Sequence, residues 1–127
     1  MTPDLLHAAC LELNGAEETF PFGPETSVFK VGGKVFALSA LAGVPLKVSL
    51  KCEPDLALTL REAHPAIVGG WHLNKRHWNT VTLDGSVPEA LLREMIEDSY
   101  DLIVAKLPRK QQLLLDWQGL RAKPGQR

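Results

Sequence analysis

Two adjacent glycines between two β-patterned runs constrain this chain more than any other feature of its sequence. Gly32 and Gly33 separate residues 28–31 from residues 34–39, and both runs are rich in apolar and β-branched side chains. The two central positions of a tight hairpin turn favour positive φ, which glycine adopts without a steric penalty. The pattern therefore predicts a β-hairpin with its turn at Gly32-Gly33.

The next run, residues 46–52, has the clearest strand pattern in the chain. Apolar residues alternate in it with Lys47, Ser49 and Lys51. Such alternation is typical of an antiparallel sheet with one buried face and one solvated face. A further strand is predicted over residues 79–83, where the same alternation recurs.

Helical periodicity marks the first and the longest helices. Thr2 and Pro3 are typical of a helix start, and we expect about three turns before Asn14-Gly15 ends this helix. A capping box is predicted at residues 86–89, where Ser86 and Glu89 cap each other's backbone amides. The longest helix follows it and ends at Pro108.

The remaining segments are shorter. A helix is predicted from Pro54 to about residue 63, and another over residues 109–118 with Leu113, Leu114 and Trp117 as its apolar face. Residues 16–26 and 68–70 are predicted to be loops because they are rich in proline or glycine, with Phe20 and Phe22 packed over an edge of the core.

This order of elements decides the fold class. Regular strand–helix–strand units do not occur in it, so a parallel sheet is not expected. We predict an α+β fold, a two-layer sandwich of an antiparallel β-sheet with helices on one face. A chain of 127 residues fits one domain. We assign this domain to residues 1–118 and expect a flexible C-terminal tail at residues 119–127.

The net charge of −1 argues against a uniformly basic surface. The charge is nevertheless uneven, because residues 27–51 carry four lysines and no acid, and residues 106–127 carry six basic residues against Asp116. The N-terminal residues do not resemble a signal peptide, and no apolar run has membrane-spanning length. We therefore expect a cytoplasmic protein with no membrane partner. Cys10 and Cys52 lack metal-site spacing and are expected to be small buried hydrophobes.

Residues 71–80 form the chemically richest segment, and two interpretations of it compete. In the first, Lys75 and Arg76 bind phosphate, Asn74 or Asn79 bonds a base or sugar, and Trp78 or His77 stacks on a base. In the second, the segment is a rigid corner whose indoles fill the core edge and whose polar side chains hold loop backbone groups.

The polar face of the predicted sheet supplies a second hint. It is expected to be basic and rich in hydroxyls, to carry no acid, and therefore to suit a nucleic acid backbone or another anionic partner. The alternative is that its lysines only keep an exposed sheet soluble and discourage edge pairing. The residues expected on this face are Lys30, Lys47, Ser49, Lys51, Trp78, Thr80 and Thr82.

We find no catalytic motif in this sequence. The four histidines (His7, His64, His72 and His77) lack the spacing of a metal site. We expect no enzymatic activity, no bound metal and no cofactor. An enzyme would require a deep pocket near His72 and His77 with strongly shifted pKa values.

Several segments together resemble the MmcQ/YjbR family, over roughly residues 3–110. The resemblance implies a fold like that of CyaY and frataxin, and a bacterial, DNA-binding protein. Frataxins carry an acidic ridge on their first helix, which Asp4 and Glu12 alone do not reproduce, so iron binding is not carried over. The segments that carry the resemblance are residues 15–18, 20–24, 28–34, 74–80, 84–85 and 99–104.

Two functional hypotheses follow. The first is a small protein that binds DNA through the basic sheet face and the corner at residues 74–79. The second is a protein-interaction or adaptor module, which would bind through the same face, the Phe20–Phe22 loop or the segment at 109–118. Charge-led binding weakens in high salt and apolar docking does not, so salt dependence separates them. The residues assigned to the nucleic acid site are Lys30, Lys47, Lys51, Asn74, Lys75, Arg76, His77, Trp78 and Asn79.

Overall fold

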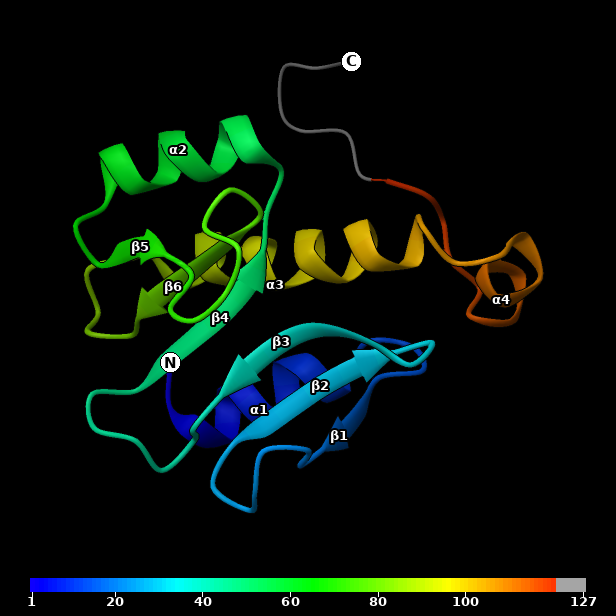
Figure 1. Cartoon of the computed structure of the whole chain (residues 1–127), viewed down its shortest axis with the longest axis horizontal. Helices are drawn as coiled ribbons and strands as arrows, with labels where there is room; N and C mark the ends of the chain where they lie inside the picture. The colour runs from blue at the N-terminus through cyan, green and yellow to red at the C-terminus, as the bar shows by residue number, and fades with distance from the viewer. Residues whose placement is uncertain (121–127) are drawn as a thin grey trace.

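The structure is a computed structural model that describes residues 1–120, and its centre is a six-stranded antiparallel sheet (Figure 1). The strand order across the sheet is β1-β2-β3-β4-β6-β5. Within the described residues, no helix is both long enough and apolar enough to cross a membrane. The strands are β1 (Glu17–Thr19), β2 (Ser27–Val31), β3 (Lys34–Ser39), β4 (Lys47–Lys51), β5 (Ile67–Gly69) and β6 (Trp78–Thr82), and the helices are α1 (Pro3–Leu11), α2 (Pro54–Ala63), α3 (Glu89–Val104) and α4 (Arg109–Leu114).

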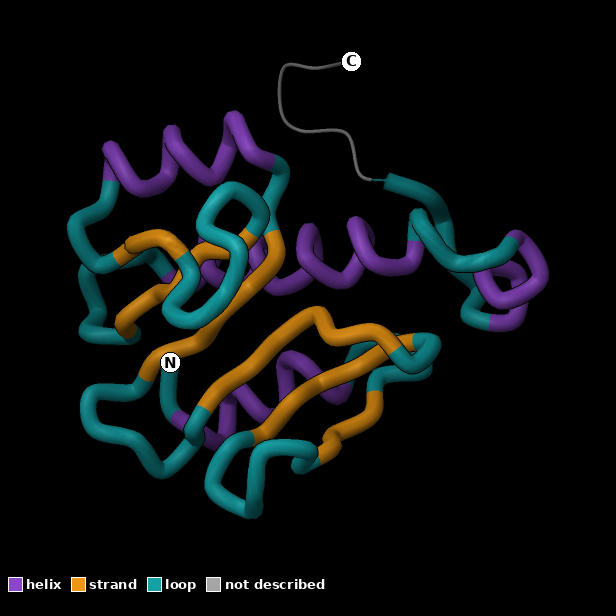
Figure 2. The backbone as a smooth tube through the Cα atoms, viewed as in Figure 1, coloured by secondary structure: helices purple, strands orange, loops and turns teal. Residues whose placement is uncertain are grey.

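Helices α1, α2 and α3 pack on one face of the sheet, which confirms the predicted α+β class. Helices α1 and α3 lie behind the strands in Figure 1, and the tube in Figure 2 shows the same two layers. Helix α2 packs at the end of the sheet formed by β5 and β6. The Asn79 side-chain amide, which faces the helices, donates a 3.4 Å hydrogen bond to the Ala57 carbonyl oxygen in α2.

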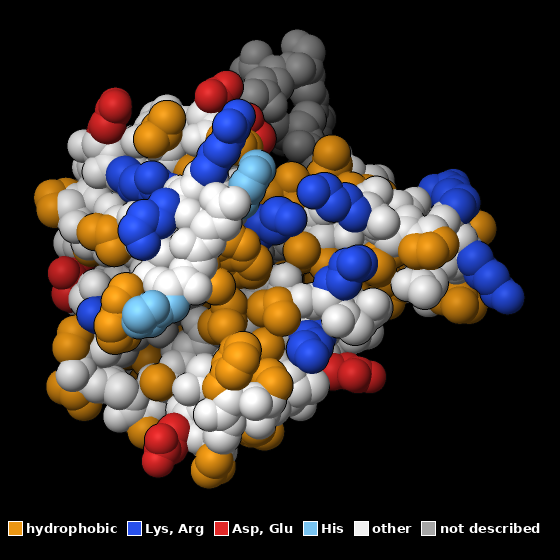
Figure 3. Space-filling model, in the orientation of Figure 1, with side chains coloured by type: hydrophobic (Ala, Val, Ile, Leu, Met, Phe, Trp, Pro, Cys, Tyr) orange, Lys and Arg blue, Asp and Glu red, His pale blue; other side chains and the backbone are white. Residues whose placement is uncertain are grey.

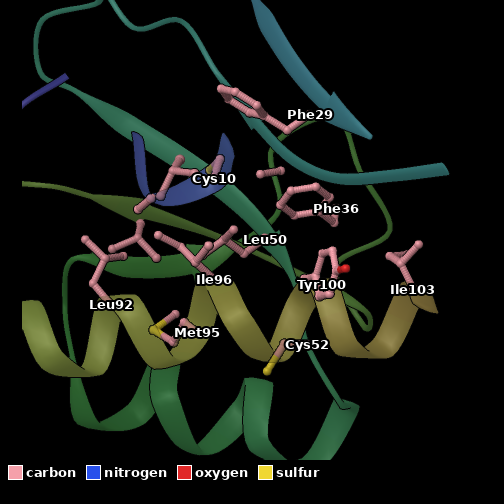
Figure 4. Close-up of a cluster of buried hydrophobic side chains, with 14 of the residues drawn as sticks. Cys10, Phe29, Phe36, Leu50, Cys52, Leu92, Met95, Ile96, Tyr100 and Ile103 are labelled. Atoms are coloured by element: carbon pink, nitrogen blue, oxygen red, sulfur yellow. The ribbon is translucent and has the colours of Figure 1, made fainter. Parts of the chain in front are cut away.

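The core between the layers is built from aromatic and aliphatic side chains (Figure 4). Phe36 of β3 is fully buried and meets Tyr100 of α3 edge to face, with ring centroids 5.6 Å apart. Cys10 of α1 and Cys52 after β4 are both buried, as expected. Burial raises the pKa of the Cys10 thiol to about 12, so this side chain behaves as an inert hydrophobe.

The predicted hairpin is confirmed, and a bulge follows it. Gly32 and Gly33 form the turn between β2 and β3 with φ of 57° and 78°. Phe29 pairs with Ala37, whereas Lys30 pairs with Val35, so Phe36 is an extra residue on β3. The bulge explains why two consecutive residues of β3, Phe36 and Ala37, are both fully buried.

The sheet is divided between its third and fourth strands. Strands β3 and β4 pair only at Ala37 with Leu50 and at Leu38 with Ser49. Beyond these pairs the strands diverge (Figure 1). Ser99 of α3 bridges the divergence, because its hydroxyl accepts a 2.9 Å hydrogen bond from the Lys51 amide and donates a 2.6 Å bond to the Phe36 carbonyl.

Three local predictions are wrong. The loops predicted at residues 16–26 and 68–70 each contribute to a three-residue edge strand, β1 and β5, too short to carry an alternation signal. Phe20 and Phe22 are exposed rather than packed over the core. The capping box does not form: Ser86 donates its backbone amide and its hydroxyl to the Asp84 carboxylate, and α3 begins after Pro88 without a side-chain cap.

The C-terminal segment docks on the domain through Leu115 and through Trp117, one residue of its predicted apolar face. The Asn14 side chain donates a 2.9 Å hydrogen bond to the Leu115 carbonyl, and the Trp117 indole donates a 2.9 Å bond to Asp101. Leu113 and Leu114 remain exposed. The predicted tail at residues 119–127 lies outside the described residues from residue 121 onward.

Candidate nucleic-acid interface

The predicted site residues of the strands, other than Asn79, lie on the face of the sheet that the helices leave open, which we call the helix-free face. The register of β4 and β6 places Lys47 opposite Thr82, and Lys51 opposite Trp78. Their side chains alternate with those of Val48 and other core residues, so they project away from the helices. Figure 3 views this face and shows basic side chains around a hollow lined with hydrophobic groups.

Three lysines from separate parts of the chain meet at the divergence of β3 and β4. Lys34 begins β3, Lys51 ends β4 and Lys106 follows α3. The pKa of Lys51 is lowered from its usual value, first by partial burial and then by the positive charges of Lys106 and Lys34. We call these three residues the lysine cluster. A lysine whose charge is opposed by partial burial and by two nearby cations favours a bound anion, because the anion relieves the repulsion.

The basic surface continues along β4. Lys47, Ser49 and Lys51 alternate on the helix-free face, and their core-facing neighbours Val48 and Leu50 are buried. Four residues of strand span about 13 Å at roughly 3.3 Å per residue. The two lysines therefore bracket a stretch of surface long enough to contact separated charges on an extended polyanion.

Arg61 of α2 organises the predicted corner at residues 74–79. Its guanidinium donates a 2.7 Å hydrogen bond to the Asn79 side-chain oxygen and further bonds to the carbonyls of Lys75 and Trp78. Asn79 has 0% exposure, so its assignment to the nucleic acid site is wrong. A buried amide paired with a guanidinium holds this loop in place and cannot reach an external ligand.

The other residues of the corner divide between structural and exposed positions. The Asn74 side-chain oxygen accepts from the Arg76 amide, as in an Asx turn, so Asn74 has a structural role. The Lys75 ammonium donates a 3.1 Å bond to the Gly70 carbonyl. His77 and Trp78 are half-buried, and the Arg76 side chain is exposed. The corner is therefore rigid, as the second interpretation predicted, and it also presents an exposed cation at Arg76.

A groove of about 530 Å³ crosses the helix-free face between two loops. Phe22, from the loop between β1 and β2, and Trp71 and His72, from the loop between β5 and β6, are among its lining residues. Ser49 and Thr80, neighbours across β4 and β6, contribute to the lining. We call this space the aromatic groove. Lys47 also lines it, so the groove joins the basic surface along β4.

The expectation of an acid-free, uniformly solvated face is wrong in two respects. Glu17 of the unpredicted strand β1 pairs with Lys30, so a carboxylate shares the face at one edge and offsets that lysine's charge. Val28 and Thr80 are buried although their side chains point to the helix-free side. The Trp71 amide donates a 3.2 Å bond to the Thr80 hydroxyl, which shows how the loop at residues 70–77 covers the sheet there.

Lys34, Lys106, Phe22 and Trp71 are site residues that the sequence prediction missed. The uneven distribution of lysines signalled the first two, yet their meeting with Lys51 depends on contacts distant in sequence. The second interpretation of residues 71–80 placed the indoles at the core edge, whereas Trp71 is 70% exposed. Among residues 1–120, no group of three histidine, cysteine or acidic side chains could hold a metal ion.

Comparisons with known proteins place this chain among close relatives. The model of the YjbR family matches residues 11–102. The uncharacterized protein YbdF of Escherichia coli O157:H7 is 46% identical over 103 residues, which cover 80% of this chain and 84% of YbdF. The uncharacterized protein YjbR of Escherichia coli K12 is 36% identical over 115 residues, 91% of this chain and 98% of YjbR.

Two solved structures of similar sequence resemble this chain in fold. The crystal structure of Deinococcus radiodurans protein DR2400, described as a DUF419 domain, superposes with a TM-score of 0.85 at 43% identity, covering 99% of this chain and 94% of that one. A Pseudomonas syringae protein superposes with a TM-score of 0.65 at 27% identity, covering 78% of this chain and 95% of that one. The helix–sheet architecture is therefore shared by these relatives.

Proposed function

This chain belongs to the YjbR family, and we propose that it is a cytoplasmic, non-enzymatic protein that binds nucleic acid through its helix-free face. DNA binding is what its resemblance to this family implied from the sequence. The lysine cluster is the observation that carries this proposal. Lys51 is partly buried, and the charges of Lys106 and Lys34, from distant parts of the chain, add to this burial in lowering its pKa. A nucleic acid backbone supplies the closely spaced negative charges that would relieve their repulsion.

The net charge of −1 sets the expected character of this binding. With no basic field over the whole surface, the affinity rests on a few local contacts and falls with salt. If the three cluster lysines each neutralise one phosphate of a single strand, the logarithm of the association constant falls by about 2 per tenfold rise in salt.

The direct test is a titration of fluorescent single-stranded and duplex oligonucleotides with the purified protein at low and moderate salt. We expect saturable binding that weakens steeply with salt. Replacing both Lys51 and Lys106 with Met should weaken binding to every nucleotide sequence. Adding the substitutions Lys75→Ala and Arg76→Ala should weaken it further. Absence of saturation at about 100 μM protein, the weak limit of ordinary non-specific binding, would refute the proposal.

The alternative proposal is a protein-interaction module, which one observation favours. Leu113 and Leu114 of α4 are 63% and 78% exposed, an apolar pair that a partner could cover. Binding through this pair would persist in high salt and would be lost in Leu113→Ser with Leu114→Ser. The Lys51 and Lys106 substitutions would leave such binding unchanged, so the two proposals make opposite predictions.

A further inference from the structure

Exposed aromatic rings are among the side chains that line the aromatic groove. Phe22 is 73% exposed and Trp71 is 70% exposed. The rings of Trp71 and His72 lie against each other in a tilted arrangement, with their centroids 4.6 Å apart and an interplanar angle of 33°. Large apolar side chains held in solvent beside a hollow mark a surface that another molecule covers.

The backbone beneath Trp71 is anchored rather than free. The Trp71 amide donates to the Thr80 hydroxyl at 3.2 Å, and the Gly70 amide donates to the Trp78 carbonyl at 2.8 Å. His72 has φ of 58°, a left-handed conformation that costs free energy for a residue with a side chain. The loop therefore fixes the backbone from which the exposed indole projects, which reduces the entropy lost when a ring stacks on it.

The groove also offers a hydrogen-bond donor. The hydroxyls of Ser49 and Thr80 are 2.7 Å apart, and their hydrogen bond uses one of their two protons. The Trp71 amide already occupies one acceptor site on Thr80, whichever hydroxyl donates. The second proton is left for an acceptor within the groove, such as a ring nitrogen or carbonyl oxygen of a nucleobase.

We propose that the aromatic groove holds an unpaired nucleobase between Phe22 and Trp71, so that the protein prefers single-stranded to duplex nucleic acid. This inference rests on the proposed function and names the form of nucleic acid that the site selects. Bases in a duplex are stacked on their neighbours and paired at their edges, so they cannot enter the groove without being extruded. Lys47 at the groove and Lys51 in the lysine cluster would follow the backbone along β4.

The test compares three probes in parallel: a single-stranded oligonucleotide, the same strand with abasic sites, and the corresponding duplex. Trp71→Ala and Phe22→Ala should each weaken binding of the intact single strand about 5- to 150-fold, the range expected for one stacked base. Both variants should bind the abasic strand as the unaltered protein does. Phe20→Ala is the matched control, because Phe20 is exposed in the same loop but does not line the groove.

The outcomes separate this inference from the proposed function. Equal binding of intact and abasic strands, or unchanged binding by the Trp71 and Phe22 variants, would refute the proposal that the aromatic groove holds a base. Salt-sensitive binding that still depends on Lys51 and Lys106 would then leave phosphate recognition standing. If none of the three probes binds, both proposals are wrong. Thermal melting of each variant checks that the domain remains folded.

Discussion

The Ser99 hydroxyl donates a 2.6 Å hydrogen bond to the Phe36 carbonyl, so a helix side chain takes the place of a neighbouring strand. The same oxygen accepts from the Lys51 amide on the other side of the divergence. One side chain thereby satisfies two backbone groups that the sheet itself leaves unpaired, and it allows β3 and β4 to separate where the lysine cluster lies.

Replacing Ser99 with Ala should destabilise the protein by about 1–3 kcal/mol, because a buried donor and a buried acceptor lose their partner. Chemical denaturation measures the change. Ser86→Ala is the control, since Ser86 is exposed and bonds only to its neighbour Asp84. A Ser99→Ala protein as stable as the unaltered chain would mean that water or a sheet rearrangement replaces the hydroxyl.

Asn79→Ala should also lower stability, again by about 1–3 kcal/mol, because the Arg61 guanidinium loses a buried acceptor. The salt dependence of nucleic acid binding should not change, since Asn79 is buried. Asn74→Ala removes an exposed turn contact and should cost less. A shallower salt dependence in Asn79→Ala than in Asn74→Ala would contradict the structural role assigned to Asn79.

Lys106→Met should bring the pKa of Lys51 back toward its usual value, because one of the charges that lowers it is removed. Nucleic acid binding should weaken, and its salt slope should fall by about 0.7 for a single strand. Stability should stay the same or rise slightly, since repulsion is relieved. Arg93→Met makes the same charge change on α3, where Arg93 faces Glu89, and should leave binding intact. A loss of stability in Lys106→Met would argue against repulsion within the cluster.

Glu17→Gln should strengthen nucleic acid binding, by up to about fivefold, the effect of one exposed charge pair. The carboxylate lies on β1 opposite Lys30 and opposes a bound phosphate. Glu12→Gln changes the same charge at the end of α1, on the helix side, and is the matched comparison. Equal affinities for the two variants would show that the bound strand does not approach Lys30.

Glu18 gives the protein a defined sensitivity to acid. Its pKa is lowered from 4.5, first by a hydrogen bond from Ser27 and also by His7. A carboxyl with a depressed folded pKa contributes stability that is present above pH 4.5 and is lost as the pH falls through the folded pKa. Glu18→Gln should therefore flatten the loss of melting temperature below pH 4.5. An unchanged pH profile would assign the acid sensitivity to other carboxyls.

Local patterns predicted most of the fold. The glycine pair correctly predicted the hairpin, and the alternation at residues 46–52 predicted the correct face of the sheet for Lys47, Ser49 and Lys51. The edge strands escaped prediction because three residues cannot show a period and are stabilised by the neighbouring strand. The bulge at Phe36 likewise depends on pairing with β2, which no local pattern reports.

The site was less predictable, for two different reasons. Asn79 could have been excluded from sequence alone, because it shares strand parity with the inward residue Val81 and must face the helices. The lysine cluster could not have been predicted in this way. Lys106 reaches Lys51 only because α3 crosses behind the sheet and ends beside the β2–β3 turn, and its contacts with this region are long-range in sequence.

The two shortest strands have a consequence for self-association. The edges of a sheet expose unpaired amides and carbonyls, on which a second molecule can add a strand and begin aggregation. Here both edges, β1 and β5, are three residues long, and β1 carries two adjacent carboxylates, Glu17 and Glu18. Each edge thus presents little backbone to a neighbouring copy, and one of them repels it. The longer inner strands, whose exposed face bears the groove, are protected from edge-to-edge polymerisation.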